Sequence, residues 1–355
     1  MDRREFIKLS SAAVVTPAIA GCTGREVIQH EEAPVSGFDR DATAEEVTEG
    51  LDLSGKVAVV TGCNSGIGYE TLRVLALRGA YVIGTGRTLE KAQRACDSVR
   101  GITHPIELEL SDYESVVACS EEILALERPV DILICNAGIR AVEHEIVNGV
   151  EQDFAVNHLG HFLLVNRLLG GLFAAPQGRV VVVSSAAAYG SSVPAGGIQF
   201  DNLDGHKGFE TSTAYAHSKL ANALFSRQLA KRLKDTRITS NALHPGVIKT
   251  AIARDSSALL NLGFSIYAAV SGKSLEEGAA TTCYVATHPT LSRVSGLFFQ
   301  DCNAVRIDGN NYLEDDQQAE RLWQVSEELT KDYLVDYDWP EISIAAASGA
   351  DGLTG

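Results

Sequence analysis

Short apolar stretches alternate with longer amphipathic stretches from Leu51 onward, and this alternation limits the possible folds more than any other feature. Stretches such as Val57–Val60 and the four valines at 180–183 have no polar face, so we expect strands that are covered on both sides. Right-handed crossovers through the intervening helices then predict an α/β fold. This fold is a single doubly wound (Rossmann) domain with a parallel sheet and helices on both faces.

Composition divides the chain into four parts. The acidic stretch 23–50 has no sustained apolar period and is interpreted as a linker, while the small and polar residues near the end are interpreted as a loose tail. The predicted parts are an export signal at 1–22, the linker at 23–50, the Rossmann domain at 51–335 and a C-terminal tail at 336–355. Within the domain we expect strands at 57–60, 81–83, 105–110, 130–135 and 180–184, and helices at 68–77, 89–99, 113–126, 149–169 and 213–233.

The N-terminus carries an arginine pair, Arg3-Arg4, followed by an apolar run and small residues before Cys22. This combination resembles a twin-arginine export signal joined to a bacterial lipoprotein processing site. It predicts lipidation of Cys22 and a protein anchored on the periplasmic side of a bacterial membrane. If the signal is not used, the protein is expected in the cytoplasm.

Charge and cysteine content narrow the classes of partner. A net charge of −16 argues against a nucleic-acid partner, because phosphate binding requires a basic face. The six cysteines after Cys22 show no metal-binding or disulfide spacing, so they are interpreted as small buried or loop thiols. No metal is expected, and His158, His161, His217 and His244 are interpreted as helix-surface or packing residues.

A glycine-rich turn follows the first expected strand and opens a helix. Gly62 permits the tight turn, Gly66 lets the backbone approach a pyrophosphate, and Gly68 lets the helix pack against the strand. The N-terminus of that helix supplies free N–H groups and a positive dipole end. The spacing differs from the common G-x-G-x-x-G pattern, but the order of strand, turn and helix predicts a dinucleotide site.

The residues at the end of the second strand distinguish a binding site for NAD from one for NADP. A carboxylate there binds the ribose 2′-hydroxyl of NAD, whereas an arginine accommodates the 2′-phosphate of NADP. Here Gly86 takes the place of the acid and Arg87 follows it. The sequence favours NADP, with NAD as the alternative; a plain solvated loop cation is the other interpretation of Arg87.

Tyr215 and Lys219 lie four residues apart on an expected helix, so they share one face. A nearby ammonium favours a phenolate, which suits a tyrosine to acid–base work. Ser184-Ser185 follows the valine strand at its carboxyl end, where ligands bind in such sheets. These positions predict a catalytic site.

Six motifs occur in order: the glycine turn, Cys135-Asn136-Ala137-Gly138, Asn157, Ser184-Ser185, Tyr215-x-x-x-Lys219 and His244-Pro245-Gly246. Together they resemble the short-chain dehydrogenase/reductase family over about residues 51 to 332. Several stretches, such as Ala214–Leu224, look most like retinol dehydrogenases and their relatives.

This resemblance implies a role for each site residue. Tyr215 would be the acid/base, Ser185 would steady the substrate oxygen, and Lys219 would bind the nicotinamide ribose and lower the pKa of Tyr215. Asn157 would hold a water linking Lys219 to solvent. The cofactor-binding residues would be Gly62, Asn64, Ser65, Gly66, Ile67, Gly68, Arg87, Glu109, Leu110, Asn136, Ala137, Gly138, Tyr215, Lys219, Val247 and Thr250.

Two positions depart from the family pattern: Cys135 replaces the first asparagine of the usual N-N-A-G, and Glu109 replaces an aspartate near the adenine. The apolar run 258–264 suggests a lipophilic alcohol or carbonyl substrate. The expected function is therefore that of an NADP-dependent, retinol dehydrogenase-like oxidoreductase. A homo-oligomer is a possible assembly of the protein. The alternative is a catalytically silent dinucleotide-binding sensor, a class that typically lacks the tyrosine or the lysine.

Overall fold

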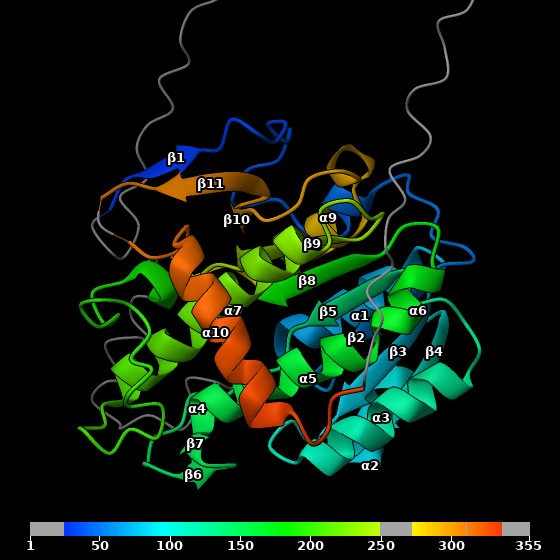
Figure 1. Ribbon diagram of the computed structural model, residues 1–355. Helices are drawn as coiled ribbons and strands as arrows, with labels where there is room; N and C mark the ends of the chain where they lie inside the picture. The colour runs from blue at the N-terminus through cyan, green and yellow to red at the C-terminus, as the bar shows by residue number, and fades with distance from the viewer. Residues whose placement is uncertain (1–24, 249–271, 310, 336–355) are drawn as a thin grey trace, which may run out of the picture.

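A computed structural model describes residues 25–248, 272–309 and 311–335. In this part of the chain, nine strands form one sheet in the order β1-β11-β10-β9-β8-β5-β2-β3-β4 (Figure 1). The strands from β10 to β4 run parallel, and β11 and β1 add antiparallel pairings at one edge. The bounds are β1 Val27–Gln29, β2 Val57–Val60, β3 Tyr81–Gly86, β4 Ile102–Glu107, β5 Ile132–Cys135, β8 Arg179–Val183, β9 Thr239–His244, β10 Phe298–Gln300 and β11 Asn303–Ile307.

Helices cover both faces of this sheet, and each face buries its own apolar cluster. One face carries α3, α5, α6, α7 and α10, and Figure 1 shows α10 crossing in front of α7. The other face carries α1, α2 and α9. The doubly wound α/β prediction is confirmed. The helix bounds are α1 Gly66–Leu77, α2 Leu89–Asp97, α3 Tyr113–Ala125, α5 Gly160–Arg167, α6 Leu169–Ala174, α7 Thr211–Arg232, α9 Leu275–Thr287 and α10 Asp316–Thr330.

The long helix predicted at 149–169 is wrong at its start and in its continuity. Residues 146–151 form a small hairpin, β6 Ile146–Val147 and β7 Val150–Glu151. The helical part begins with α4 (Gln152–Phe154), passes through a π-helical segment, η2 (Ala155–Leu159), and continues as α5. Asn148 and Gly149 adopt positive φ values of 53° and 82° in the hairpin turn, so a helix cannot begin at Gly149.

The third strand also lies earlier than predicted, at Ile102–Glu107 rather than at 105–110. The prediction began it at Pro105, a residue that cannot donate to a strand ladder. In the structure β4 is the outermost strand of the sheet, and an edge position tolerates proline because one side of the strand needs no partner.

The interpretation of 23–50 as a linker is wrong for residues 25–50, which fold onto the domain. Strand β1 pairs antiparallel with β11, with Ile28 opposite Arg306. Farther along, Ala44 and Val47 are buried at 0% and 2% exposure in the cluster that contains α1 and α9. The Ala44 N–H donates to the carbonyl of Glu276 at 2.8 Å. Few apolar residues suffice here because α1 and α9 supply the rest of the apolar surface.

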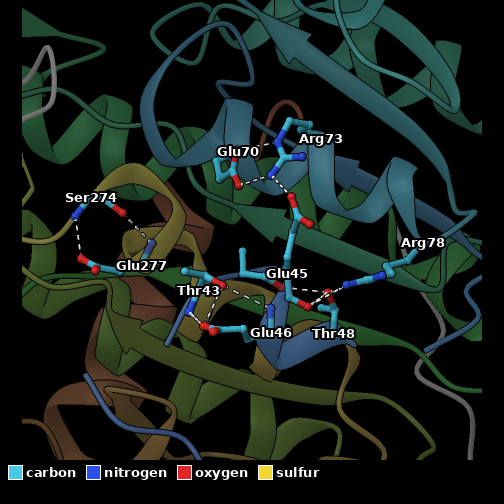
Figure 2. A network of polar contacts seen from close by, with 10 residues as sticks. Thr43, Glu45, Glu46, Thr48, Glu70, Arg73, Arg78, Ser274 and Glu277 are labelled. Carbon is cyan, nitrogen blue, oxygen red and sulfur yellow. Dashed lines mark hydrogen bonds and ion pairs between the residues drawn. The ribbon is translucent and has the colours of Figure 1, made fainter. Parts of the chain in front are cut away.

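A polar network fixes this N-terminal strap, residues 39–51, against α1 (Figure 2). Arg73 of α1 donates to Glu45 of the strap at 2.7 Å and to Glu70 at 2.6 and 2.8 Å. Arg78 donates to Thr48 Oγ1 at 3.0 Å. Figure 2 shows Arg73 between the two carboxylates, so charges on the strap and on α1 neutralise each other.

Two further features concern helices and thiols. Of the helices in the described ranges, none is both long and apolar enough to cross a bilayer. The six cysteines after Cys22 are all buried, as predicted. Cys22 and the predicted tail at 336–355 lie outside the described residues.

Candidate active site

The site forms at the carboxyl ends of β5 and β8, beside the N-terminal part of α7. Strand β8 is buried at all five positions and ends just before the two serines. Ser184 is buried and donates to the carbonyl of Lys219 at 2.7 Å, so its role is structural. Ser185 begins the 3₁₀ turn η3 (Ala186–Tyr189), where its Oγ accepts from the Ala187 N–H at 3.2 Å.

Tyr215 and Lys219 project from the first turns of α7 toward Ser185. The Lys219 Nζ lies 5.7 Å from the centre of the Tyr215 ring and donates to the carbonyl of Val183 at 3.1 Å. Ser185 lies close enough to the Tyr215 phenol to favour its ionised form. Sequence spacing therefore identified three side chains that the fold brings together.

Burial changes the proton affinities of both residues. It raises the pKa of Tyr215 to about 12, although the nearby Ser185 hydroxyl acts to lower it. Burial also lowers the pKa of Lys219 to about 8. The desolvation penalty on each charged form explains both directions.

Asn157 lies in the π-helical segment η2 and is fully buried. Its side chain accepts from the Ile139 N–H at 2.8 Å and donates to the Ile139 carbonyl at 2.9 Å. It also donates to Ser218 Oγ at 2.9 Å. A β-carbon added to Gly138 would lie 3.1 Å from Asn157 Oδ1 and 3.2 Å from Lys219 Nζ. Asn157 thus clamps the loop after β5 against α7, while its predicted contact with a water stays a prediction.

The glycine turn has the geometry that a close-approaching ligand needs. Gly62 and Gly66 adopt positive φ values of 68° and 61°. A β-carbon on Gly68 would lie 2.3 Å from the Gly62 carbonyl oxygen and 2.4 Å from Asn136 Nδ2. Asn136 in turn donates to the carbonyl of Thr61 at 2.8 Å. Ser65 directly precedes α1, so the turn leads into a helix N-terminus.

A hydrogen-bonded chain links this turn to the catalytic helices. The Thr61 hydroxyl accepts from the backbone N–H groups of Asn136 and Ala137, both at 2.9 Å. His161 Nε2 lies 2.9 Å from the same hydroxyl, and its Nδ1 lies 3.0 Å from the carbonyl of Asn157. A carbonyl can only accept, so Nδ1 carries the hydrogen and Nε2 accepts from Thr61.

All four histidines interpreted as helix-surface or packing residues are buried, so packing is confirmed and the helix surface is not. Burial lowers the pKa of each, to about 3 for His158 and about 4 for His161, His217 and His244. These histidines are neutral at pH 7, which suits their place inside the fold.

Arg87 is exposed directly after β3, just before Thr88, which caps α2. Gly86 packs close to that helix, because a β-carbon there would lie 3.1 Å from the Ala92 nitrogen. Beside the glycine turn lies a surface hollow with two cations and no carboxylate. Its lining is Asn64, Ser65, Tyr69, Lys91, Arg94, Ala95 and Ser98.

The remaining predicted contacts are less closely grouped. Glu109 Oε1 accepts from the N–H and hydroxyl of Ser111 at 3.1 and 2.8 Å, so its carboxylate already fixes a loop. Leu110 is buried at 4% exposure. The carbonyl of Val247 accepts from the Lys273 N–H at 2.9 Å. Thr250 and the apolar run 258–264 lie outside the described residues.

Sequence reasoning missed two charged residues at this site, Asp153 and Arg140. Asp153 is fully buried on α4, and the Arg140 guanidinium carbon lies 5.7 Å from the centre of the Tyr215 ring. Arg140 follows Gly138 by two residues, and Asp153 precedes Asn157 by about one helical turn, but nothing in the sequence marks either as buried.

A family model described as short chain dehydrogenase matches residues 56–196 and 198–260, more than half of the chain. The chain belongs to the short-chain dehydrogenase family. Members of this family are oxidoreductases that bind NAD(P) and act on small alcohol or carbonyl substrates, so this chain is an oxidoreductase of that kind.

Relatives of this short-chain dehydrogenase span nearly its whole described length. It is 41% identical to human retinol dehydrogenase 12 over 287 residues, which cover 79% of this chain and 87% of the relative. It is 37% identical to the chloroplastic short-chain dehydrogenase TIC 32 A of Brassica napus over 317 residues, covering 84% and 96% of the two chains. The predicted family and its retinol dehydrogenase-like relatives are confirmed.

Solved structures support the same fold. A protein from Mycobacterium paratuberculosis superposes with a TM-score of 0.64 at 31% identity, covering 80% of this chain and 97% of that one. A structure from Beutenbergia cavernae, described as a gluconate 5-dehydrogenase with NADP bound at low occupancy, has a TM-score of 0.55 at 28% identity. That match covers 70% of this chain and 95% of the other.

Proposed function

We propose that this short-chain dehydrogenase transfers a hydride between NADP and a lipophilic alcohol or carbonyl compound, with Ser185, Tyr215 and Lys219 as its catalytic residues. The observation that carries the proposal is the convergence of these three side chains at the carboxyl ends of the parallel strands. Ligands bind at this edge in doubly wound sheets. A silent sensor is not favoured, because the tyrosine, lysine and serine are all present and in contact.

Each residue has a role that its contacts permit. Tyr215 exchanges a proton with the substrate oxygen, and Ser185, which acts on the same phenol, binds that oxygen. Lys219 supplies a positive charge close to the phenol and is held in place by the Val183 carbonyl. Asn157 keeps the loop after β5 in register with α7.

The residues present fit a dinucleotide. Gly68 leaves no room for a side chain, because a β-carbon there would lie 2.3 Å from the Gly62 carbonyl oxygen, and Gly62 and Gly66 adopt positive φ values that shape the tight turn before α1. With the dinucleotide bound, its nicotinamide would donate or accept the hydride. Asn136 and Ala137 pack directly against this turn.

Two observations favour NADP over NAD. Arg87 is exposed at the end of β3, and no carboxylate lines the neighbouring hollow, to which Lys91 and Arg94 contribute. A 2′-phosphate can accept hydrogen bonds from a guanidinium, whereas the 2′-hydroxyl of NAD prefers a carboxylate. NADP also occurs in the Beutenbergia cavernae structure.

The lipophilic substrate and the location are also proposed from the sequence. The run 258–264 is apolar, and relatives at 41% identity are named retinol dehydrogenase 12. The Arg3-Arg4 pair and Cys22 favour export and lipid anchoring on the periplasmic side of the membrane. Mass spectrometry of the membrane-extracted protein tests this directly, since an unmodified Cys22 in a cytoplasmic protein would contradict it.

The experiment that tests the function is a cofactor-coupled assay across a panel of lipophilic aldehydes, ketones and alcohols, with the Arg87→Ala variant beside the native protein. We expect activity with NADP, and a variant whose Kd for NADP rises about tenfold or more while its Kd for NAD changes little. Equal losses for both cofactors would show that Arg87 only supports its loop. Absence of turnover with any compound of the panel would contradict the proposed reaction.

A further inference from the structure

Two charged side chains that the catalytic scheme leaves unused border Tyr215 and Lys219. Asp153 has 0% exposure, and one carboxylate oxygen accepts from the Ala141 N–H at 2.7 Å. Its other oxygen is buried with no hydrogen-bond partner among the described residues, and so is the Nε atom of Arg140. Buried polar atoms without partners are uncommon and often mark functional sites.

The position of these charges follows from the loop that Asn157 clamps. That clamp holds Ile139, and the next residue is Arg140, whose guanidinium carbon lies 5.7 Å from the Tyr215 ring centre. This matches the 5.7 Å between the ring centre and Lys219 Nζ. Tyr215 therefore has a cation from each of two different elements, the loop after β5 and α7.

Resting on the function proposed above, we propose that Asp153 and Arg140 are positioning residues of opposite charge for this site. The carboxyl group favours the protonated forms of Lys219 and Tyr215, and the guanidinium favours loss of the Tyr215 proton. Both act through the field that they impose rather than by touching the substrate. The Arg140 charge lies 5.7 Å from the Tyr215 ring centre, and Asp153 is buried beside the same loop, where its carboxylate accepts from the Ala141 N–H. In such a poorly solvated site, a field of this kind is large enough to move a titration by on the order of one pH unit.

The groups that face these residues are few. Besides Arg140 and Lys219, Asp153 faces the Ala141 N–H and Glu151, whose own charge is influenced by His144. Burial raises the pKa of Asp153 to about 8, and the charge of Glu151 adds to that rise.

Two other elements face the catalytic pair. Ser185 faces Tyr215 from the start of η3, and His161 of α5 lies within the field of Lys219. His161 is neutral over the working range, because burial lowers its pKa to about 4. Asp153 is a buried carboxyl whose charge changes in the same pH range as that of Lys219.

In carbonyl reduction, Asp153 and Arg140 shift the pH dependence of activity in opposite directions. Tyr215 must give up a proton in this direction, so activity falls when the solution becomes alkaline enough to remove the proton from Tyr215 or Lys219. Removing the Asp153 carboxyl lets both protons leave at lower pH. Removing the Arg140 guanidinium keeps both protons bound up to a higher pH.

The test uses the full chain with the Asp153→Asn and Arg140→Met variants and their combination, in aldehyde reduction with NADPH. The pH above which kcat/KM falls should be lower by on the order of one unit in Asp153→Asn and higher in Arg140→Met. The double variant should lie between them. The matched control is Glu143→Gln, an exposed acid of the same loop, which should leave the limb in place. Shifts of the same sign in both variants, or none in either, would overturn the proposal.

A second readout does not depend on turnover and so separates this proposal from the proposed function. Carbon-13 NMR of labelled aspartate follows the Asp153 carboxyl directly, assigned by its loss in Asp153→Asn. We expect it to titrate near pH 8 in the native protein and at higher pH in Arg140→Met. If Asp153 titrated in the ordinary range near 3.8, or if its titration did not change in Arg140→Met, the proposed roles of the two residues would be wrong even in a fully active enzyme.

Discussion

The N-terminal strap and the catalytic site handle their charges in opposite ways. Where the strap meets α1, Arg73 of the helix forms ion pairs with Glu45 of the strap and with Glu70, at 2.7 and 2.6 Å. At the catalytic site, Asp153 is fully buried, yet it has one oxygen without a partner and no ion pair. The first arrangement fixes a segment in place, whereas the second leaves charge available to act on neighbouring groups. At Asp153 the missing partner points to a functional role, whereas the charges around Arg73 are paired and structural.

The comparison predicts the largest effect at the catalytic site. Tyr215→Phe removes one hydroxyl from an otherwise unchanged ring, so turnover should fall about a hundred- to ten-thousand-fold while folding and cofactor binding persist. Single-turnover kinetics, cofactor titration and a urea unfolding curve measure the three quantities. A variant with near-native turnover would remove Tyr215 from the mechanism.

The buried histidines predict how stability depends on pH. Burial lowers the pKa of His158 to about 3, so the unfolded state takes up this proton first as the pH falls below about 6.5. The contribution is present above pH 6.5 and is lost toward pH 3. Between pH 7 and 5 this histidine alone should lower the free energy of unfolding by about 2 kcal/mol.

Urea unfolding of the native protein and of His158→Gln at several pH values tests this histidine. The variant should show a shallower loss of stability in acid, whatever its stability at pH 7. An identical dependence on pH in both proteins would show that His158 does not contribute to it.

On the strap, the expected effect is on stability alone. Arg73→Met leaves Glu70, whose side chain is 6% exposed, without its cation, and should cost about 1–2 kcal/mol of unfolding free energy. Thermal unfolding and turnover are the two measurements, and turnover should stay native. The control is Lys331→Gln, which breaks an exposed pair with Glu328 and should change stability by less than about 0.5 kcal/mol. If Arg73→Met lost turnover while its stability stayed native, the idea that the strap serves stability alone would be wrong.

Much of the fold could be predicted because the parallel strands carry their own signature. Val57–Val60 and the valines of β8 are apolar on both faces, and only a covered sheet accommodates such strands. The site residues could be predicted because Tyr215 and Lys219 share a helix face and Ser185 ends a strand. These are local patterns, which a sequence displays directly.

The parts that were missed depend on contacts far along the chain. Residues 25–50 have few apolar side chains, and Ala44 becomes buried only because α1 and α9 lie beneath it. The charges of Asp153 and Arg140 are ordinary in the sequence, and only their burial and missing partners distinguish them. Neither property can be obtained from spacing alone.

The pairing of β1 with β11 has a consequence for how the molecule is made. Val27 emerges early in synthesis, but its partner Ile307 emerges some 280 residues later. The edge strand β1 therefore cannot pair until the residues of β11 have been synthesised. A contact of such long range is slow to form, because the intervening chain must first be brought together. The segment that opens the described fold thus takes its place in the sheet only after nearly all of the sheet has been made.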